Sequence, residues 1–438
     1  RVAGHGLARV EARVPVCHRR EAPGALRRAP TDGAPYSGRI PRHRWGIEHR
    51  PVRRSTPLLA VALVATLCPA GVRAEGGLRK GPWLMDLRPG SLVVMAERNT
   101  PGALSVRAVP LPRAGATTDA GPGLAREAEE VTERRLHELR LDNLRPDTRY
   151  RYTVTGPGIT PQDGEFTTPP TPGTATPFRF ALYGDTRSQP GPHRAVVEAL
   201  VREAPAFAVH TGDLVEDGRN EAHWQEFFDI EAPLLRRVPF VPVIGNHEIV
   251  RPMSSGIENY RRYVHVTPDG PMPELDYVFR YGNARFVLAN SYDDWTGTAR
   301  EWLDGELARA RREAPTDWLF VVMHWGPRSS GPHGDNELLA LAGIDRILRR
   351  HRVDLVIAGH DHVYERGDDD RLRYLVTGGG GAPLYYRATQ RSATRVFAVA
   401  HHYVRAEVEA ERVRFVALRP DGTEIDRATL LRDGCEDL

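Results

Sequence analysis

Five apolar runs in the second half of the chain each lead into a short polar motif. The runs cover residues 178–183, 206–210, 239–244, 319–323 and 355–358. Runs of this length that are rich in β-branched and aromatic residues predict buried strands. In open α/β sheets, ligands bind beyond the carboxyl ends of the strands. We therefore expect the polar residues that follow the runs to converge on one edge of a sheet.

The motifs place metal-binding side chains at these strand ends. Carboxylate, imidazole and amide groups suit two divalent or mixed-valence cations, for which Fe, Mn and Zn are the candidates. We expect one carboxylate, Asp213, to bridge the two cations, and we expect Asp185 and His362 to complete the first site. The full set of predicted ligands is Asp185, Asp213, Asn246, His324, His360 and His362.

A water that bridges two such cations becomes a nucleophile at neutral pH. Metal binding lowers its pKa from about 16 to about 7. The resulting hydroxide would attack the phosphorus of a phosphate ester in line. His247 follows the predicted ligand Asn246 and is placed to protonate the leaving oxygen. The sequence thus predicts His247 as a catalytic residue.

Helical patterns alternate with the predicted strands from residue 178 onwards. Apolar residues recur at helical spacing in residues 192–203, 303–310 and 338–348. After Arg373 the pattern changes to hairpins, with predicted strands at 373–377, 397–408 and 413–418. We therefore expect residues 178–431 to form an α/β domain of two sheets packed face to face, with helices outside.

The segment before this domain has a different character. Residues 79–168 contain short alternating runs that are separated by Pro, Gly and Asn, which predicts a small β-sandwich. Residues 169–177 are rich in proline, which fixes φ and favours extended chain. We interpret residues 169–177 as a linker. The sandwich contains no cluster of catalytic side chains.

The first 74 residues show no pattern of a folded domain. Residues 1–54 contain thirteen arginines against four acidic residues, and we interpret them as disordered or translated upstream of the true start. Arg53-Arg54, the apolar run 57–67 and Ala74 predict a signal peptide over residues 55–74, and hence a secreted or periplasmic protein. Twin-arginine export, a lipid anchor at Cys68 and a buried core strand remain alternatives.

Composition limits the partners of the chain. The formal net charge is only +3, much of it in residues 1–54, so a nucleic-acid partner has little support. The apolar run 57–67 is shorter than the about 20 residues that span a bilayer, so we expect no stable membrane span after signal cleavage.

The ordered motif set resembles the calcineurin-like metallophosphoesterase superfamily. Gly245-Asn-His-Glu248 and Gly359-His-Asp-His-Val-Tyr-Glu-Arg366 resemble the purple acid phosphatase branch, and the β-sandwich is similar to a fibronectin type III-like domain. The resemblance implies a two-sheet βαβαβ metallophosphoesterase sandwich with flanking helices, preceded by an all-β fibronectin type III-like sandwich. It also implies a dinuclear metal centre.

Two positions depart from the patterns of these families. Where purple acid phosphatases have an iron-binding tyrosine, this chain has Glu216, and where the calcineurin side has a histidine, it has Arg187. We expect Glu216 or water to complete the first metal site and the protein to be colourless. Arg187 would then be free to clamp a substrate phosphate.

These features together predict an exported phosphatase that hydrolyses small phosphate monoesters. One alternative is a phosphodiesterase or nucleotide hydrolase, because the same metals serve those reactions. Another is a secreted binding module with a vestigial metal site.

Overall fold

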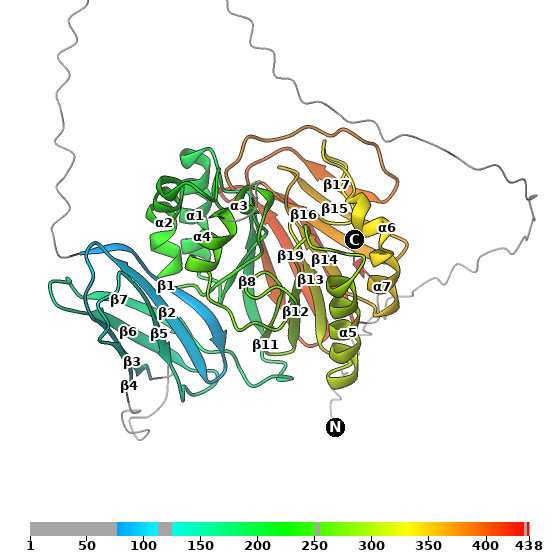
Figure 1. Ribbon diagram of the computed structural model, residues 1–438. Coiled ribbons are helices and arrows are strands. Elements are labelled where there is room, and N and C mark those ends of the chain that lie inside the picture. The colour runs from blue at the N-terminus through cyan, green and yellow to red at the C-terminus, as the bar shows by residue number, and fades with distance from the viewer. Residues whose placement is uncertain (1–76, 113–124, 250–254, 433–435, 438) are drawn as a thin grey trace, which may run out of the picture. The chain divides into compact units, whose positions relative to one another are not determined.

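The computed structural model describes residues 77–112, 125–249, 255–432 and 436–437 (Figure 1). The predicted segments 1–54 and 55–74 lie outside these residues. All described residues belong to one unit of the chain. None of the helices in the described part of the chain is long and apolar enough to cross a membrane.

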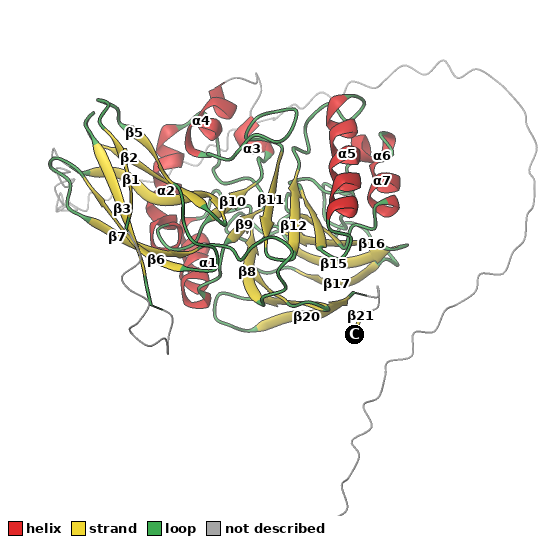
Figure 2. Cartoon of the chain, turned by 90° about the horizontal axis from the view of Figure 1, so that it is seen from below, coloured by secondary structure: helices red, strands yellow, loops and turns green. Residues whose placement is uncertain are grey.

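The first seven strands form two antiparallel sheets, with strand orders β1-β2-β5 and β4-β3-β6-β7 (Figure 2). In β6, buried Tyr150, Tyr152 and Val154 alternate with more exposed residues, because successive side chains of a strand point to opposite faces. The seven strands are β1 (Leu78–Arg88), β2 (Ser91–Arg98), β3 (Leu104–Pro110), β4 (Arg126–Glu130), β5 (Leu136–Leu141), β6 (Arg149–Thr155) and β7 (Gln162–Thr167).

Strand β1 packs against helix α2 (Glu221–Leu235) of the following domain. The Lys80 ammonium on β1 lies 2.5 Å from a carboxylate oxygen of Glu97 and 2.5 Å from one of Glu221. The ring of Trp83 lies 4.6 Å from that of Phe228. A partly buried ion pair, Lys80–Glu221, and an aromatic contact therefore join β1 to the α/β domain.

Two seven-stranded sheets form the α/β domain, with strand orders β10-β9-β8-β18-β19-β20-β21 and β11-β12-β13-β14-β16-β15-β17. Strands β8, β9 and β10 are parallel, as are β12, β13, β14 and β16. The first sheet contains β8 (Phe178–Tyr183), β9 (Ala208–His210), β10 (Phe240–Pro242), β18 (Tyr403–Val408), β19 (Arg412–Leu418), β20 (Glu424–Leu431) and β21 (Glu436–Asp437). The second contains β11 (Tyr277–Tyr281), β12 (Ala284–Leu288), β13 (Trp318–Val322), β14 (Leu355–Ala358), β15 (Tyr364–Asp369), β16 (Leu372–Thr377) and β17 (Thr394–Ala398).

The second sheet is buried on both faces. Phe286 and Leu288 of β12 belong to the apolar cluster shared with the first sheet, whereas Val287 belongs to the cluster under the helices α5 (Thr298–Glu313) and α7 (Ile344–Arg350). Figure 2 shows α5, α6 and α7 together beside this sheet. The prediction of two sheets with helices outside is therefore confirmed.

The remaining helices are short or lie on the other side of the domain. Helices α1 (Pro190–Glu203) and α2 contact each other, and α1 also contacts β18. The others are α3 (Asn246–Ile249), α4 (Ser255–Tyr263) and α6 (Glu337–Leu341).

Two elements differ from the sequence-based expectation. Residues 338–348, predicted as one helix, form α6 and α7, because Gly343 between them adopts a left-handed φ of 69°. Leu338 and Leu341 are consequently 57% and 84% exposed. The predicted strand 397–408 is divided, because β17 pairs with β15 in one sheet and β18 pairs with β8 in the other. The chain crosses between the two sheets at residues 399–402.

Candidate metal centre

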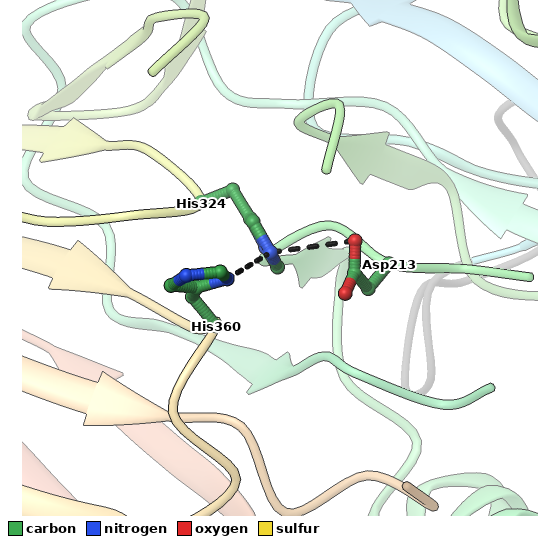
Figure 3. A group of neighbouring side chains, drawn as sticks. All are labelled: Asp213, His324 and His360. Atoms are coloured by element: carbon green, nitrogen blue, oxygen red, sulfur yellow. Dashed lines mark hydrogen bonds and ion pairs between the residues drawn. The ribbon is translucent and has the colours of Figure 1, made fainter. Parts of the chain in front are cut away.

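Two groups of possible metal ligands lie beyond the carboxyl ends of the parallel strands. Asp185, Asp213 and His362 form the first group, and Asp213, His324 and His360 form the second. Within each group the ligand atoms all lie within 4.8 Å of one another, and every residue is buried. Figure 3 shows His324 of the second group between Asp213 and His360. The groups share Asp213, which is the residue expected to bridge two cations.

The sixth predicted ligand, Asn246, adjoins the second group. Its side-chain oxygen lies 3.1 Å from Nε2 of His324 and accepts a hydrogen bond of 3.0 Å from the hydroxyl of Tyr292. The structure therefore brings all six predicted ligands together, from the ends of β8, β9, β10, β13 and β14.

Three of these residues adopt left-handed backbone conformations. The φ angles of Asp185, Asp213 and His360 are 56°, 53° and 70°. Such conformations cost about 1–3 kcal/mol in a non-glycine residue and are concentrated at functional sites. Here they follow directly on the strand ends, and the backbone N–H of His360 lies 3.1 Å from each carboxylate oxygen of Asp185. The sharp turns thus bring separate motifs into contact.

Two motif glycines permit close approach of these loops. A Cβ atom on Gly245 would lie 2.1 Å from Oδ1 of Asp213, and one on Gly359 would lie 2.5 Å from Oδ2 of Asp185. No side chain fits at either position. These glycines leave room for the carboxylates.

Hydrogen bonds to carbonyl oxygens orient the two outer imidazoles. Nδ1 of His324 donates to the carbonyl of Thr211 at 2.7 Å, and Nδ1 of His362 donates to that of Pro383 at 2.6 Å. Each Nε2 therefore faces the carboxylates: that of His324 is 3.3 Å from Asp213, and that of His362 is 3.6 Å from Asp185. This is the second-sphere arrangement that holds metal-binding histidines in place.

The buried carboxylates favour positive charge beside them. Burial and the neighbouring Asp213 raise the pKa of Asp185 to about 8. Burial alone would raise the pKa of Asp213 as well, but His324 holds it well below its usual range. Asp213 and Asp185 in turn overcome the effect of burial on His324 and raise its pKa to about 9. Because unpaired buried charges are costly, two carboxylates in this environment suit bound cations.

Arg187 lies beside the first group. Its Nε is 3.3 Å from Oδ2 of Asp213, its Nη2 is 3.4 Å from Nε2 of His362, and its Nη1 donates to a carboxylate oxygen of Glu216 at 3.0 Å. The Glu216 carboxylate also accepts a hydrogen bond from Ser188 and belongs to neither ligand group. Arg187 and Glu216, the two residues that depart from the family patterns, therefore form one ion pair.

His247 lies on the rim of the site. Its Nδ1 donates to the backbone carbonyl of Glu216 at 2.6 Å, and its Nε2 lies 3.8 Å from Oδ2 of Asp213. Its backbone N–H donates to Oδ1 of Asp213 at 3.0 Å. The ring is thus fixed by one nitrogen and presents the other to the region of the ligand groups.

Several residues of the site were missed by the sequence interpretation. The fully buried Glu248 accepts backbone hydrogen bonds from Asp213 at 3.0 Å, Val215 at 3.1 Å and Gly245 at 2.8 Å, so it ties two ligand loops together. Burial and the nearby Asp213 raise its pKa to about 7. The sequence signal for Glu248 was its place as the fourth residue of the Gly-Asn-His-Glu motif.

Aromatic residues also contact the ligands. The ring of Tyr385 stacks on His362, with centroids 4.0 Å apart, and the ring of His333 lies 4.1 Å from that of His360. Tyr292 bonds to Asn246, as described above. Neither tyrosine lies near a ligand motif in the sequence, so no local signal could have identified them.

The fold and the ligand groups together define a class of protein. Residues 178–364 match the calcineurin-like phosphoesterase family. This part of the chain is therefore a calcineurin-like metallophosphoesterase domain. The family uses a dinuclear metal centre, and the two groups joined by Asp213 are candidates for its ligands.

The relatives of the chain include purple acid phosphatases. The chain is 28% identical over 267 residues to purple acid phosphatase 23 of Arabidopsis thaliana, covering 53% of this chain and 57% of the relative. It is 32% identical over 282 residues to an uncharacterized protein of Mycobacterium tuberculosis, covering 55% of this chain and 52% of the relative. The chain thus spans about half the length of the curated relatives that it matches.

A solved structure shows the same fold. The purple acid phosphatase PPD1 of yellow lupin superposes with a TM-score of 0.66 at 18% identity, covering 80% of this chain and 73% of the lupin chain. The structure of PhoD gives a TM-score of 0.62 at 15% identity and covers 80% and 90% of the two chains. At these identities the likeness concerns the fold alone.

Proposed function

We propose that this protein is a metal-dependent hydrolase of phosphate monoesters. The observation that carries the proposal is the pair of buried ligand groups that share Asp213, with Arg187 and His247 beside them. The relatives support it, since they include a phosphoenolpyruvate phosphatase of Allium cepa at 28% identity over 264 residues.

The six ligands would hold the two cations as the sequence suggested. Asp185, Asp213 and His362 would bind one, and Asp213, Asn246, His324 and His360 the other. The bound cations would supply Lewis acidity, which activates water and neutralises phosphate charge. Because Arg187 and Ser188 already engage the Glu216 carboxylate, water is favoured over Glu216 as the remaining ligand of the first cation.

Arg187 would bind the phosphate group of the substrate. Its side chain is only 12% exposed and is anchored by Glu216 at Nη1, so Nη2 is held beside the ligands of the first cation. A guanidinium can bond two phosphate oxygens at once. A phosphate monoester presents more charge and more free oxygens than a diester, which favours the monoester.

His247 would donate a proton to the leaving oxygen. The carbonyl of Glu216 fixes the ring through Nδ1, so Nε2 is directed toward the site and in the imidazolium form carries the proton to be donated. Positioned acids of this kind contribute about 10²–10⁴-fold to a rate.

Turnover of paired esters tests the proposal. Purified protein loaded with Mn²⁺, Zn²⁺ or Fe²⁺ should hydrolyse para-nitrophenyl phosphate faster than bis(para-nitrophenyl) phosphate or ATP. Asp213→Asn should reduce hydrolysis of the monoester to background. Preferred turnover of the diester or of ATP would identify the alternative phosphodiesterase or nucleotide hydrolase. Metal-loaded protein that hydrolysed none of the three would be a binding module instead.

We further propose that the protein is exported and that β1–β7 form a fibronectin type III-like domain. The Arg53-Arg54 pair and the apolar run 57–67 support export. Amino-terminal sequencing of the mature protein from the periplasm or culture medium should find a chain that begins after Ala74. A mature protein that retains residues 55–74 would contradict the predicted cleavage.

A further inference from the structure

A cavity of about 790 Å³ lies at the end of the second sheet that is opposite the candidate metal centre. Its walls come from the segments that precede β13 and β14, from the start of β16 and from the ends of α5, α7 and β20. Strands β13, β14 and β16 are parallel, and His324 and His360 follow the carboxyl ends of the first two. The cavity therefore lies at the amino ends of these strands, away from the metal centre.

Arginine dominates the lining of this cavity, which we call the arginine cavity. Seven of its eleven lining residues are arginines, and Asp354 is the one carboxylate among them. Arginine remains charged at every pH that a folded protein meets. The formal net charge of the whole chain is only +3, so this is a strong local concentration of positive charge. The arginines are Arg311, Arg349, Arg350, Arg352, Arg371, Arg373 and Arg432.

Backbone carbonyls, which carry no formal charge, fix several of these guanidinium groups. Arg311 donates to the carbonyls of His351 and Asp317, each at 2.9 Å. Arg432 donates through Nε to the carbonyl of Ala410 at 3.1 Å and lies 4.2 Å from the ring centroid of Trp318. These contacts orient the side chains and leave their charge in place.

Carboxylates compensate only part of this charge. Asp354 accepts from Arg311 at 3.1 Å and also from the backbone N–H of Leu319 at 2.8 Å. Outside the lining, Asp304 contacts Arg350 and His351, Asp369 lies 3.5 Å from Arg349, and Asp368 lies 3.9 Å from Arg373.

Arg352 and Arg371 are the exposed arginines of the cavity without such compensation. The described residues place no carboxylate oxygen within 4.0 Å of either guanidinium. Both residues lie in turns with left-handed backbone, with φ angles of 51° and 68°. The turns before β14 and β16 thus each present a guanidinium group that is available to a ligand.

We propose that the arginine cavity binds a compact anion that carries several phosphate groups. Guanidinium groups bind phosphate oxygens in pairs, and arginines from several elements could contact different phosphates of one ligand. The volume of about 790 Å³ lies in the usual range of small-ligand sites, about 300–1,000 Å³. A compact concave shape favours a small polyanion over an extended nucleic acid.

Calorimetric titration tests this site in an Asp213→Asn background, where metal-site turnover is suppressed. Inorganic tripolyphosphate and inositol hexakisphosphate are the two probes. Tighter binding of tripolyphosphate would indicate a linear inorganic ligand, and tighter binding of inositol hexakisphosphate would indicate a cyclic organic ligand. Arg352→Gln/Arg371→Gln should weaken binding at least about tenfold, because each guanidinium would lose a charge-assisted hydrogen bond to a phosphate oxygen. Raising the salt concentration should weaken binding further.

A matched control removes the same charge elsewhere. Arg312→Gln/Arg346→Gln changes two exposed arginines outside the lining and should leave the affinity unchanged. Asp354→Asn removes the carboxylate of the cavity while keeping an acceptor for Arg311, so it should tighten binding. Equal affinities in the two double variants, weaker binding in Asp354→Asn, or no saturable heat with either probe would overturn the proposal. The metal centre is independent of this result.

Discussion

Asp213 connects nearly every part of the metal centre. Its carboxylate belongs to both ligand groups, accepts the backbone N–H of His247 at 3.0 Å and lies 3.3 Å from Nε of Arg187. Its own N–H donates to the buried Glu248 at 3.0 Å. A change at this residue should therefore disturb both cation sites at once.

At His247, the proton-donor role predicts an effect that depends on the leaving group. In His247→Asn, kcat on an alkyl ester such as glycerol phosphate should fall by about 10²–10⁴-fold, because an alkoxide needs a proton to leave. The fall on para-nitrophenyl phosphate should be much smaller, since nitrophenolate leaves unprotonated. Steady-state kinetics on both esters checks this.

The control for this variant is His265→Asn. His265 pairs with Glu138 at 2.8 Å, away from both ligand groups, and its replacement should leave both rates unchanged. Equal losses on the two esters in His247→Asn would argue against proton donation.

At Arg187, the clamp predicts an effect on binding. Arg187→Ala should raise KM for a monoester by about 10–150-fold, which corresponds to about 1.5–3 kcal/mol for a charged hydrogen bond. Inhibition by inorganic phosphate should weaken in parallel. Arg187→Lys keeps the charge but loses the planar fork, so it should show an intermediate KM.

Glu216→Gln provides the comparison for Arg187. It removes the partner that anchors Nη1 at 3.0 Å while keeping the guanidinium, so its KM should change less than that of Arg187→Ala. Unchanged KM and unchanged phosphate inhibition in Arg187→Ala would contradict the clamp.

Much of the candidate site at residue scale could be predicted, because each proposed ligand follows closely on an apolar run. Asp185 and His324 are identified by where a strand ends. Tyr292 and Tyr385 could not be found in this way, since they reach the site only through the folded path of the chain. The anchoring of Glu216 to Arg187 is likewise a tertiary contact.

At the scale of elements, the break between α6 and α7 depends on one glycine. Gly343 has a φ of 69° and open space where a Cβ would stand, so Gly343→Ala introduces backbone strain without a clash. The variant should lose about 1–2 kcal/mol of unfolding free energy, the cost of left-handed backbone in a residue with a Cβ. Urea unfolding followed by circular dichroism measures this.

A Gly→Ala substitution within α5 should change the free energy of unfolding in the opposite direction. Gly305 also has no atom within 4 Å of a built Cβ, but it lies in the exposed interior of a helix. Gly305→Ala should therefore stabilise the protein by about 1 kcal/mol. A shift in the same direction for both variants would refute this account of the break.

These elements also show where the sequence pattern fails. Leu338 and Leu341 continue the helical spacing of Ile344 and Ile347, so periodicity alone predicts one helix, although both leucines are exposed. Residues 397–408 are predicted as one strand because apolar residues occur along the whole run. Its division depends on the pairing partners β15 and β8, which a local pattern does not contain.

At the scale of the whole molecule, the second sheet separates two kinds of site. The carboxyl ends of β13 and β14 lead to the proposed metal ligands, and their amino ends meet the arginine cavity. Two face-to-face sheets were predictable from the change to hairpins after Arg373. The arginine cavity was not predictable, because its walls come from segments between Arg311 and Arg432.

Metal content per chain tests the central claim most directly. Protein purified without chelators and analysed by elemental mass spectrometry should contain two Fe, Mn or Zn ions per chain. Asp213→Asn should contain fewer, because it removes the carboxylate that both groups share. Asp217→Asn, at an acidic position outside both groups, should retain two. One ion or none in the wild-type protein, or an unchanged content in Asp213→Asn, would contradict a dinuclear centre bridged by Asp213.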